Sequence, residues 1–148
     1  MKKTLLLPLV ALVAALAAPA PAPAQEPAPL AEFVAAAARL WAGGDADGLV
    51  DLAPSGGRIL LDLGGDAPGE VQPRNAGAAL RRLFAERETV SVRPARATVS
   101  GGSPLRGFGE LTWTSRSRGV REAQPATVYV GTVHEDGAWR IRELRVLR

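Results

Sequence analysis

The sequence predicts a single α+β domain, in which three N-terminal helices pack on a curved antiparallel sheet. Two features of the apolar residues carry this prediction. Between residues 30 and 88 they recur at intervals of three and four, the spacing of amphipathic helices. After Glu88 they alternate with polar residues, the spacing of strands that bury one face.

The first predicted helix spans "LAEFVAAAARLWA". Its apolar residues fall on one face with helical spacing: Leu30, Phe33, Val34, Ala37, Leu40 and Trp41. Gly43 and Gly44 end this helix, because glycine readily takes the backbone conformation found just beyond a helix C-terminus. Asp45 is then placed to cap a short second helix, "ADGLVDLA", which Pro54 stops.

A short strand, "RILLDLGG", follows and runs into a glycine turn. The third predicted helix is "RNAGAALRRLFAER", with Asn75 as the expected N-cap. Its buried stripe is expected to consist of four residues: Ala76, Leu80, Leu83 and Phe84.

Four strands are predicted after the third helix: "TVSVRPARATVS", "GFGELTWTSRS", "ATVYVGTV" and "AWRIRELRVL". In the last strand Trp139 and Ile141 have one parity, whereas Leu144 and Val146 have the other. A bulge or bend near residues 142–143 would bring all four side chains to the same face and increase the curl of the sheet.

The N-terminal segment "MKKTLLLPLVALVAALAAPAPAPAQ" has the features of a secretory signal peptide. Two lysines precede an apolar run, and small residues precede Gln25. The alternative, a membrane anchor, is disfavoured because the run is short and is followed by Pro-Ala repeats. We therefore expect a signal peptide over residues 1–24, a Pro/Ala-rich linker over 25–29 and one domain over 30–148. The mature protein would be periplasmic or extracellular, without membrane insertion.

Composition excludes several kinds of chemistry. The chain has no cysteine, which rules out disulfides, thiolate metal ligands and a cysteine nucleophile. Its only lysines lie in the predicted signal peptide, so Schiff-base chemistry is unavailable after cleavage. Arginines and acids nearly balance in the mature chain, which argues against a nucleic-acid partner.

The charges are nevertheless unevenly placed. Residues 25–73 carry two arginines and eight acids, and residues 74–148 carry fourteen arginines and seven acids. The two halves either screen each other within the domain or leave a basic sheet face for an acidic partner. Arg116, Arg118 and Arg121 lie at an expected hairpin end, either solvated or available to an anionic group.

His134, the only histidine, is followed by Glu135 and Asp136. This cluster raises the question of an acid–base or metal site. "EDG" is a hairpin turn signal, since Gly137 can take a positive φ, and neighbouring side chains on an extended chain point in alternate directions. We therefore expect an exposed hairpin tip, and no metal or cofactor.

The order of these elements resembles the nuclear transport factor 2-like superfamily, which includes the ketosteroid isomerase-like and polyketide cyclase-like proteins. The resemblance covers residues 30–147 and rests on three pieces: "DADGLVDLAPSGGRILLDLGG", "AGAALRRLFAE" and the closing "DGAWRI" hairpin. It implies a sheet that curls around a long helix and leaves a conical cavity. That cavity is an active site in some members and a ligand pocket in others.

Enzymes of that superfamily need acids or a His–Asp pair in the cavity, and this sequence departs from that pattern. Asp62, Glu110 and Glu143 are the strand carboxylates, and no strand carries two inward acids. We therefore expect no catalytic residue. The alternatives are an enzyme of the isomerase, cyclase or hydrolase type that uses a cavity carboxylate, and a structural partner at the cell envelope.

The predicted function is an exported binding or interaction module with a small apolar cavity. Its partner would be a small apolar ligand or a protein, and the outer sheet face could form a homodimer. Parity and the resemblance place eight residues at the cavity, with Tyr129 as its polar handle and Arg58 and Asp62 near its mouth. The full set is Trp41, Arg58, Asp62, Phe84, Leu111, Trp113, Tyr129 and Trp139. Equally, the bulk of these rings could fill the cone.

Overall fold

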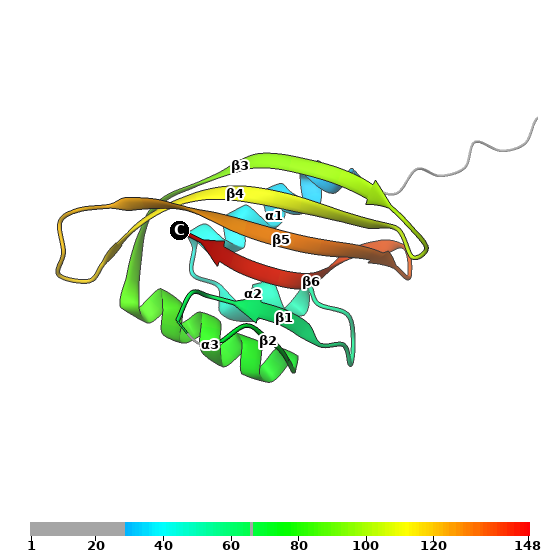
Figure 1. The fold of residues 1–148 in the computed structure, drawn as a ribbon, viewed down its shortest axis with the longest axis horizontal. Coiled ribbons are helices and arrows are strands. Elements are labelled where there is room, and N and C mark those ends of the chain that lie inside the picture. Colours follow the sequence, from blue (N-terminus) through cyan, green and yellow to red (C-terminus); the bar gives the residue numbers. More distant parts are fainter. Residues whose placement is uncertain (1–28, 66) are drawn as a thin grey trace, which may run out of the picture.

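The structure, a computed structural model, describes residues 29–65 and 67–148 (Figure 1). Its helices are α1 (Leu30–Ala42), α2 (Ala46–Asp51) and α3 (Pro73–Glu86). Its strands are β1 (Ile59–Asp62), β2 (Gly69–Val71), β3 (Arg87–Gly101), β4 (Arg106–Ser117), β5 (Gln124–Glu135) and β6 (Ala138–Leu147). The predicted signal peptide and the linker up to residue 28 lie outside the described residues. No helix in the described ranges is long and apolar enough to cross a membrane.

The strands form one six-stranded sheet in the order β2-β1-β6-β5-β4-β3. The α+β class with helices on a curved sheet is confirmed, with two refinements. The sheet is only mostly antiparallel, because β1 pairs with β6 in parallel. Between α2 and α3, where one strand was predicted, the chain forms two, β1 and the unpredicted β2.

The ends of the helices follow the capping signals in two cases out of three. Gly44 follows α1 with φ 64°, and the Asp45 carboxylate accepts a 2.8 Å hydrogen bond from the Gly48 backbone N–H at the start of α2. The expected Asn75 cap of α3 is wrong. That helix begins at Pro73, after Gln72, because proline needs no N–H partner in the first turn and its fixed φ suits that position.

The predicted bulge in the last strand is confirmed. The pairing of β5 with β6 shifts between Gly131, opposite Glu143, and Thr132, opposite Ile141, which leaves Arg142 as the extra residue. Ile141 and Leu144 consequently both point into the core. The bulge thus reconciles the two parities in the sequence.

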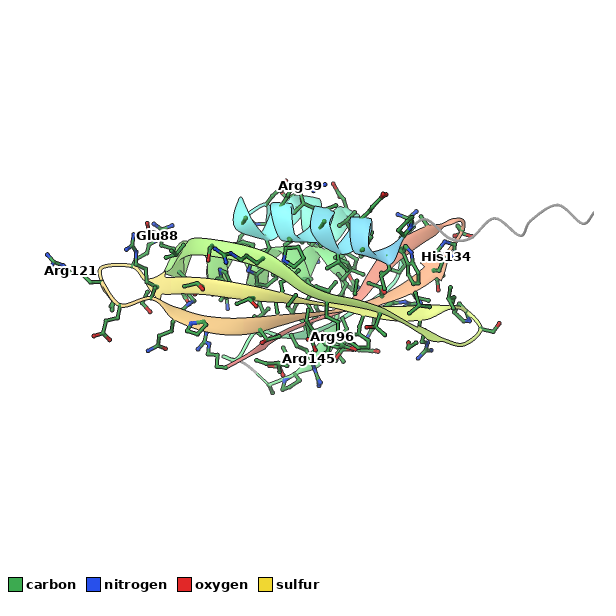
Figure 2. The ribbon with its side chains drawn as sticks, turned by 90° about the horizontal axis from the view of Figure 1, so that it is seen from above. Arg39, Glu88, Arg96, Arg121, His134 and Arg145 are labelled. Atoms are coloured by element: carbon green, nitrogen blue, oxygen red, sulfur yellow. The ribbon has the colours of Figure 1, made fainter. Side chains whose placement is uncertain are left out.

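Throughout, the inner face of the sheet is the one that α1 covers, and the outer face is the opposite one. Figure 2 shows α1 on one side of the sheet, whereas Arg96 and Arg145 project from the other. The hydrophobic core lies between the inner face and the helices. At its centre Trp41 and Trp113 are fully buried and meet edge to face, with ring centroids 5.3 Å apart.

Two glycines of β4 allow α1 to lie directly against the sheet. A Cβ atom added at Gly107 would lie 2.6 Å from Leu30 Cδ2, and one at Gly109 would lie 2.8 Å from Val34 Cγ1. Leu30 and Val34 are four residues apart, so they stack on one face of the helix. The glycines of "RGFGE" are therefore packing positions for α1.

Candidate functional site

The eight residues predicted to line one cavity lie on both sides of the sheet. Trp41, Leu111 and Trp113 have no solvent exposure, and Trp139 has 4%. These four pack in the core on the inner side. Phe84 is partly buried and meets Trp41 edge to face at 5.2 Å. The rings on this side therefore fill the interior of the cone.

The remaining predicted residues lie elsewhere. Tyr129 and Arg58 line a hollow on the outer face, and Asp62 stands opposite Arg145 in the β1–β6 pair, with its side chain accepting from the Gly64 backbone N–H at 3.3 Å. Because the sheet lies between them and the tryptophans, the eight residues do not surround a single cavity. The prediction failed because odd-numbered residues such as Trp113 face inward on β4, whereas even-numbered residues such as Val128 face inward on β5. Tyr129 therefore faces outward.

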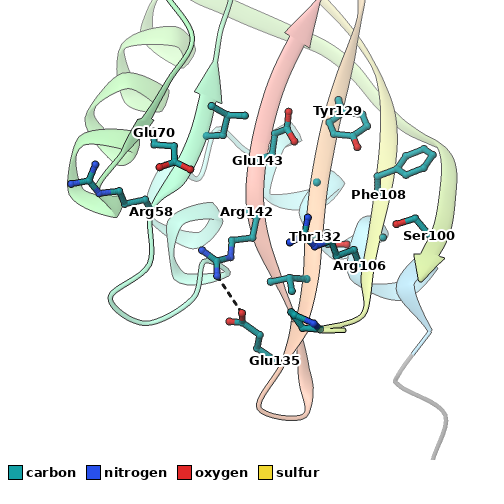
Figure 3. Close-up of a pocket in the computed structure, with 15 residues that line it drawn as sticks. Arg58, Glu70, Ser100, Arg106, Phe108, Tyr129, Thr132, Glu135, Arg142 and Glu143 are labelled. Atoms are coloured by element: carbon teal, nitrogen blue, oxygen red, sulfur yellow. Dashed lines mark hydrogen bonds and ion pairs between the residues drawn. The ribbon is translucent and has the colours of Figure 1, made fainter. Parts of the chain in front are cut away.

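The outer hollow has a volume of about 460 Å³ and crosses β1, β6, β5 and β4 (Figure 3). Phe108 and Tyr129 stack on its floor with ring centroids 5.5 Å apart. Its walls are charged, and the Arg142 guanidinium pairs with the Glu135 carboxylate at 3.2 Å. Arg58, Glu70 and Arg106 complete a ring of mixed charge.

Tyr129 is electrostatically perturbed on this face. Burial raises the pKa of its hydroxyl, and the negative charge of Glu143 raises the pKa further. Gly131 makes room for that carboxylate, since a Cβ atom there would lie 2.8 Å from Glu143 Cβ. Glu143 is in turn held 2.9 Å from Arg145 Nε. The phenol is therefore protonated at neutral pH and suited to hydrogen bonding rather than to proton abstraction.

A second hollow, of about 390 Å³, opens between α3 and the β1–β2 hairpin. We call it the inner hollow, because it adjoins the core. Its floor is apolar, and two of its residues, Leu61 and Leu83, belong to the buried core itself. The floor consists of Leu61, Leu63, Val71, Ala79 and Leu83. It is therefore a continuation of the core that is open to solvent.

Arginines form the rim of the inner hollow. Three described arginines line it, Arg82, Arg87 and Arg148, together with the carboxylate of Glu86. Arg87 leaves α3 as the first residue of β3, and its Nε donates to Ser115 Oγ at 2.8 Å while its guanidinium lies 5.8 Å from the Trp113 ring centroid. Burial, and then the charge of Arg148, lower the pKa of Arg87. Even so, an arginine remains charged at neutral pH.

His134 is not at an exposed tip, and this part of the prediction is wrong. The turn is correctly predicted, because Asp136 and Gly137 both have positive φ (52° and 77°) as a two-residue hairpin requires. His134, however, is half-buried and meets Trp139 edge to face at 5.2 Å. The two residues stand opposite each other in the β5–β6 pair, so the ring packs against the core.

The strand carboxylates lie away from the inner hollow. Glu110 is 3.7 Å from Arg96 on the outer face, and Glu143 and Asp62 are on that face too. Within the ranges that the structure describes, no group of three acidic or histidine side chains is arranged to hold a metal ion. Asp62, Glu110 and Glu143 are therefore not among the lining residues of the inner hollow.

Two of the three hairpin arginines have structural roles. Arg118 Nε donates to the Ala85 carbonyl at 2.5 Å, which satisfies an acceptor at the C-terminal end of α3. Arg116 makes two hydrogen bonds to the Glu88 carboxylate, at 2.9 and 3.0 Å, and this pairing lowers the pKa of Glu88. Arg121 remains at the exposed hairpin end (Figure 2).

The residues of the inner hollow were not identified as a site from the sequence. Arg87 and Arg148 are 61 positions apart and reach the hollow from opposite ends of the sheet meander. The only local signal was the excess of arginine over acidic residues in the second half of the chain. Leu63 fell in the predicted short strand, Val71 in a segment without a predicted element and Ala79 in the third predicted helix, and only the topology brings them together.

No protein-family model matches the chain, and no curated protein matches it. Solved structures do match its fold. A DUF4783 family protein from Bacteroides ovatus has a TM-score of 0.61 at 13% identity, over 76% of this chain and 91% of that one. An uncharacterised cystatin fold protein from Novosphingobium aromaticivorans has a TM-score of 0.57 at 13% identity, over 82% and 99%.

A designed nuclear transport factor 2-like protein with a long sheet gives a TM-score of 0.59 at 19% identity, over 80% of this chain and 99% of that one. The chain thus has the cone fold shared by cystatin-like and nuclear transport factor 2-like proteins. This confirms the resemblance at the level of the fold. At such low identities the likeness says nothing about the ligand.

Proposed function

We propose that the protein is an exported binding module without catalytic activity, which takes up a small apolar ligand in the inner hollow. One observation supports this most strongly: the apolar floor of the hollow is continuous with the core yet open to solvent. Covering such a surface with an apolar ligand is favourable by roughly 25 cal/mol per Å² removed from water. The volume of about 390 Å³ suits a small molecule.

The outer hollow is larger, but its composition suits this function less well. Its walls carry charges of both signs, several of them already paired, as for Arg142 with Glu135 and Glu143 with Arg145. An apolar ligand would have to desolvate these groups without replacing their hydrogen bonds. The stacked Phe108–Tyr129 pair instead favours an alternative role for this face, contact with a protein or a second copy of the chain. Sedimentation velocity would test the homodimer.

A catalytic role for the inner hollow would need a suitable carboxylate. Among the lining residues that the structure describes, Glu86 is the one acid, and it is exposed at the rim beside arginines. An exposed carboxylate at a rim is in contact with water and is not a base in a dry pocket. Measured isomerase or hydrolase activity that depends on Glu86 or Asp62 would contradict the non-catalytic proposal.

Fluorescence of N-phenyl-1-naphthylamine, a neutral apolar dye, tests the proposed site. We expect saturable enhancement that Ala79→Leu abolishes, because the larger side chain would occupy the hollow. Ala85→Leu is the matched control, since Ala85 is exposed on the same helix and does not line the hollow. Equal loss in both variants, or no saturable binding, would refute the site.

Export is tested separately by the intact mass of the secreted protein. We expect cleavage after Ala24, because small residues precede Gln25 as a signal peptidase requires. A membrane-retained product that still carries Met1 would refute export.

A further inference from the structure

The inner hollow has different chemistry at its floor and at its rim. Leu61 and Leu83 form part of an apolar floor, whereas Arg87 and Arg148 bring two guanidinium groups to the rim. Arg82 also lines the hollow and has an interaction of its own. Among the lining side chains that the structure describes, Glu86 is the one carboxylate. A ligand that covered only the floor would leave Arg87 and Arg148 without an anionic partner among the described side chains.

Arg87 is fixed in place by neutral groups. Its Nε and Nη1 donate to the hydroxyls of Ser115 and Ser117 at 2.8 and 3.4 Å, and its Nη2 donates to the Ser115 carbonyl at 3.4 Å. A guanidinium has five N–H donors, so the remaining ones are available at the rim. None of these acceptors carries a charge, and within the described ranges Arg87 forms no ion pair.

Arg148 is the second cation of the rim, and its charge affects Arg87. Its positive charge is one of the two causes that lower the pKa of Arg87, which places the two guanidinium groups in the same electrostatic environment. Arg148 is exposed and, within the described part of the chain, makes no ion pair. Like charges that share one rim repel each other, and an anion bound between them would relieve that repulsion.

We propose that the ligand of the inner hollow is an amphiphile with one anionic head group and a short apolar tail. The head group binds Arg87 and Arg148, and the tail lies on the floor formed by Leu61, Leu83 and their neighbours. The inference rests on the proposed function and specifies its ligand class. Guanidinium groups bind planar oxyanions through paired, charge-assisted hydrogen bonds, which makes a carboxylate the best-matched head.

The experiment compares three ligands with the same ten-carbon tail: decanoate, decanol and decylamine. Each displaces N-phenyl-1-naphthylamine from the mature protein, and the midpoint of displacement gives its affinity. We expect decanoate to bind about tenfold or more tightly than decanol, as a hydrogen bond to a charged group warrants. Decylamine should be the weakest, because its cation meets the arginines.

Variants of the rim assign the preference to particular residues. Arg148→Gln should reduce decanoate affinity about tenfold and leave decanol unchanged, since the side chain holds no other group in place. Arg121→Gln is the matched control, because it removes the same charge from an exposed residue that does not line the hollow (Figure 2). Glu86→Gln should have the opposite effect and strengthen decanoate binding, as it removes a negative charge from the rim.

The outcomes separate this inference from the proposed function. Two results would overturn the head-group assignment and leave the hollow as an apolar site. One is equal affinity for decanol and decanoate. The other is a preference for decanoate that Arg121→Gln reduces as much as Arg148→Gln does. Failure of all three ligands to displace the dye would overturn the inference and the proposed function together.

Discussion

The helices pack tightly against the sheet in one region and loosely in another. Where α1 crosses β4, the helix lies so close to the sheet that only glycine fits at residues 107 and 109. Where α3 faces β1 and β2, a glycine of the sheet, Gly69, has nothing within 4 Å of the position of an added Cβ atom. The first region completes the core. The second leaves apolar surface uncovered, and that difference locates the candidate site.

The largest expected effect comes from removing bulk in the closed region. Trp41→Ala should destabilise the domain by about 3–5 kcal/mol, because it deletes a fully buried ring that contacts both Phe84 and Trp113. Chemical denaturation measures the change in the free energy of unfolding. A loss below about 1 kcal/mol would mean that the tryptophan cluster is not a packed core.

A second test adds one methyl group to each region. Gly109→Ala should cost about 1–3 kcal/mol, since the new Cβ atom overlaps Val34. Gly69→Ala is the matched substitution in the open region, and we expect it to change stability by no more than about 0.5 kcal/mol. Thermal denaturation of both variants gives the comparison. Equal losses would show that the two regions do not differ in packing.

His134 packs against the closed core and does not line the inner hollow. His134→Ala should cost about 1 kcal/mol, because it removes an edge-to-face contact with Trp139. The same measurement on Asp136→Gly, at the exposed turn position with φ 52°, should show little change, since glycine tolerates that conformation. A His134→Ala protein as stable as the parent would restore the view of His134 as a solvated turn residue.

The smallest expected effect is a shift in the pKa of Tyr129 on the outer face. Tyr129 is the only tyrosine, so ultraviolet absorbance at alkaline pH titrates this residue alone. We expect its pKa to lie above the ordinary value of about 10, and to fall in Glu143→Gln. The folded state then retains a proton that the unfolded state loses, so unfolding free energy should decrease as pH rises beyond about 10. An ordinary pKa in the folded protein would contradict the burial of this hydroxyl.

The sequence was sufficient to predict the elements whose periodicity is strong. The α1 pattern from Leu30 to Trp41, the parity change after Glu88 and the bulge near Arg142 are local features, and each was found. Asn75 failed as a cap because α3 begins at Pro73, which places the N-cap at Gln72, three residues earlier. β2 was missed because a three-residue edge strand has too few residues to show alternation.

The candidate site was harder to predict, because it depends on which face of which strand meets which helix. Tyr129 and Trp113 both looked like cavity residues, yet the β4–β5 register places them on opposite faces. The inner hollow depends on the parallel β1–β6 pair, which brings Leu61 beside Leu144 and so places β1 next to the C-terminal strand. No pattern within either strand specifies that pairing.

The central claim is that a ligand enters the inner hollow, and backbone NMR tests it most directly. Titration of ¹⁵N-labelled mature protein with decanoate should shift the amide signals of Leu63, Gly69 and Ala79, whose side chains or backbone line that hollow. The amides of Phe108, Tyr129 and Gly131 at the outer hollow should stay unchanged. Saturable shifts confined to the outer set, or no saturable shift in either set, would contradict the account.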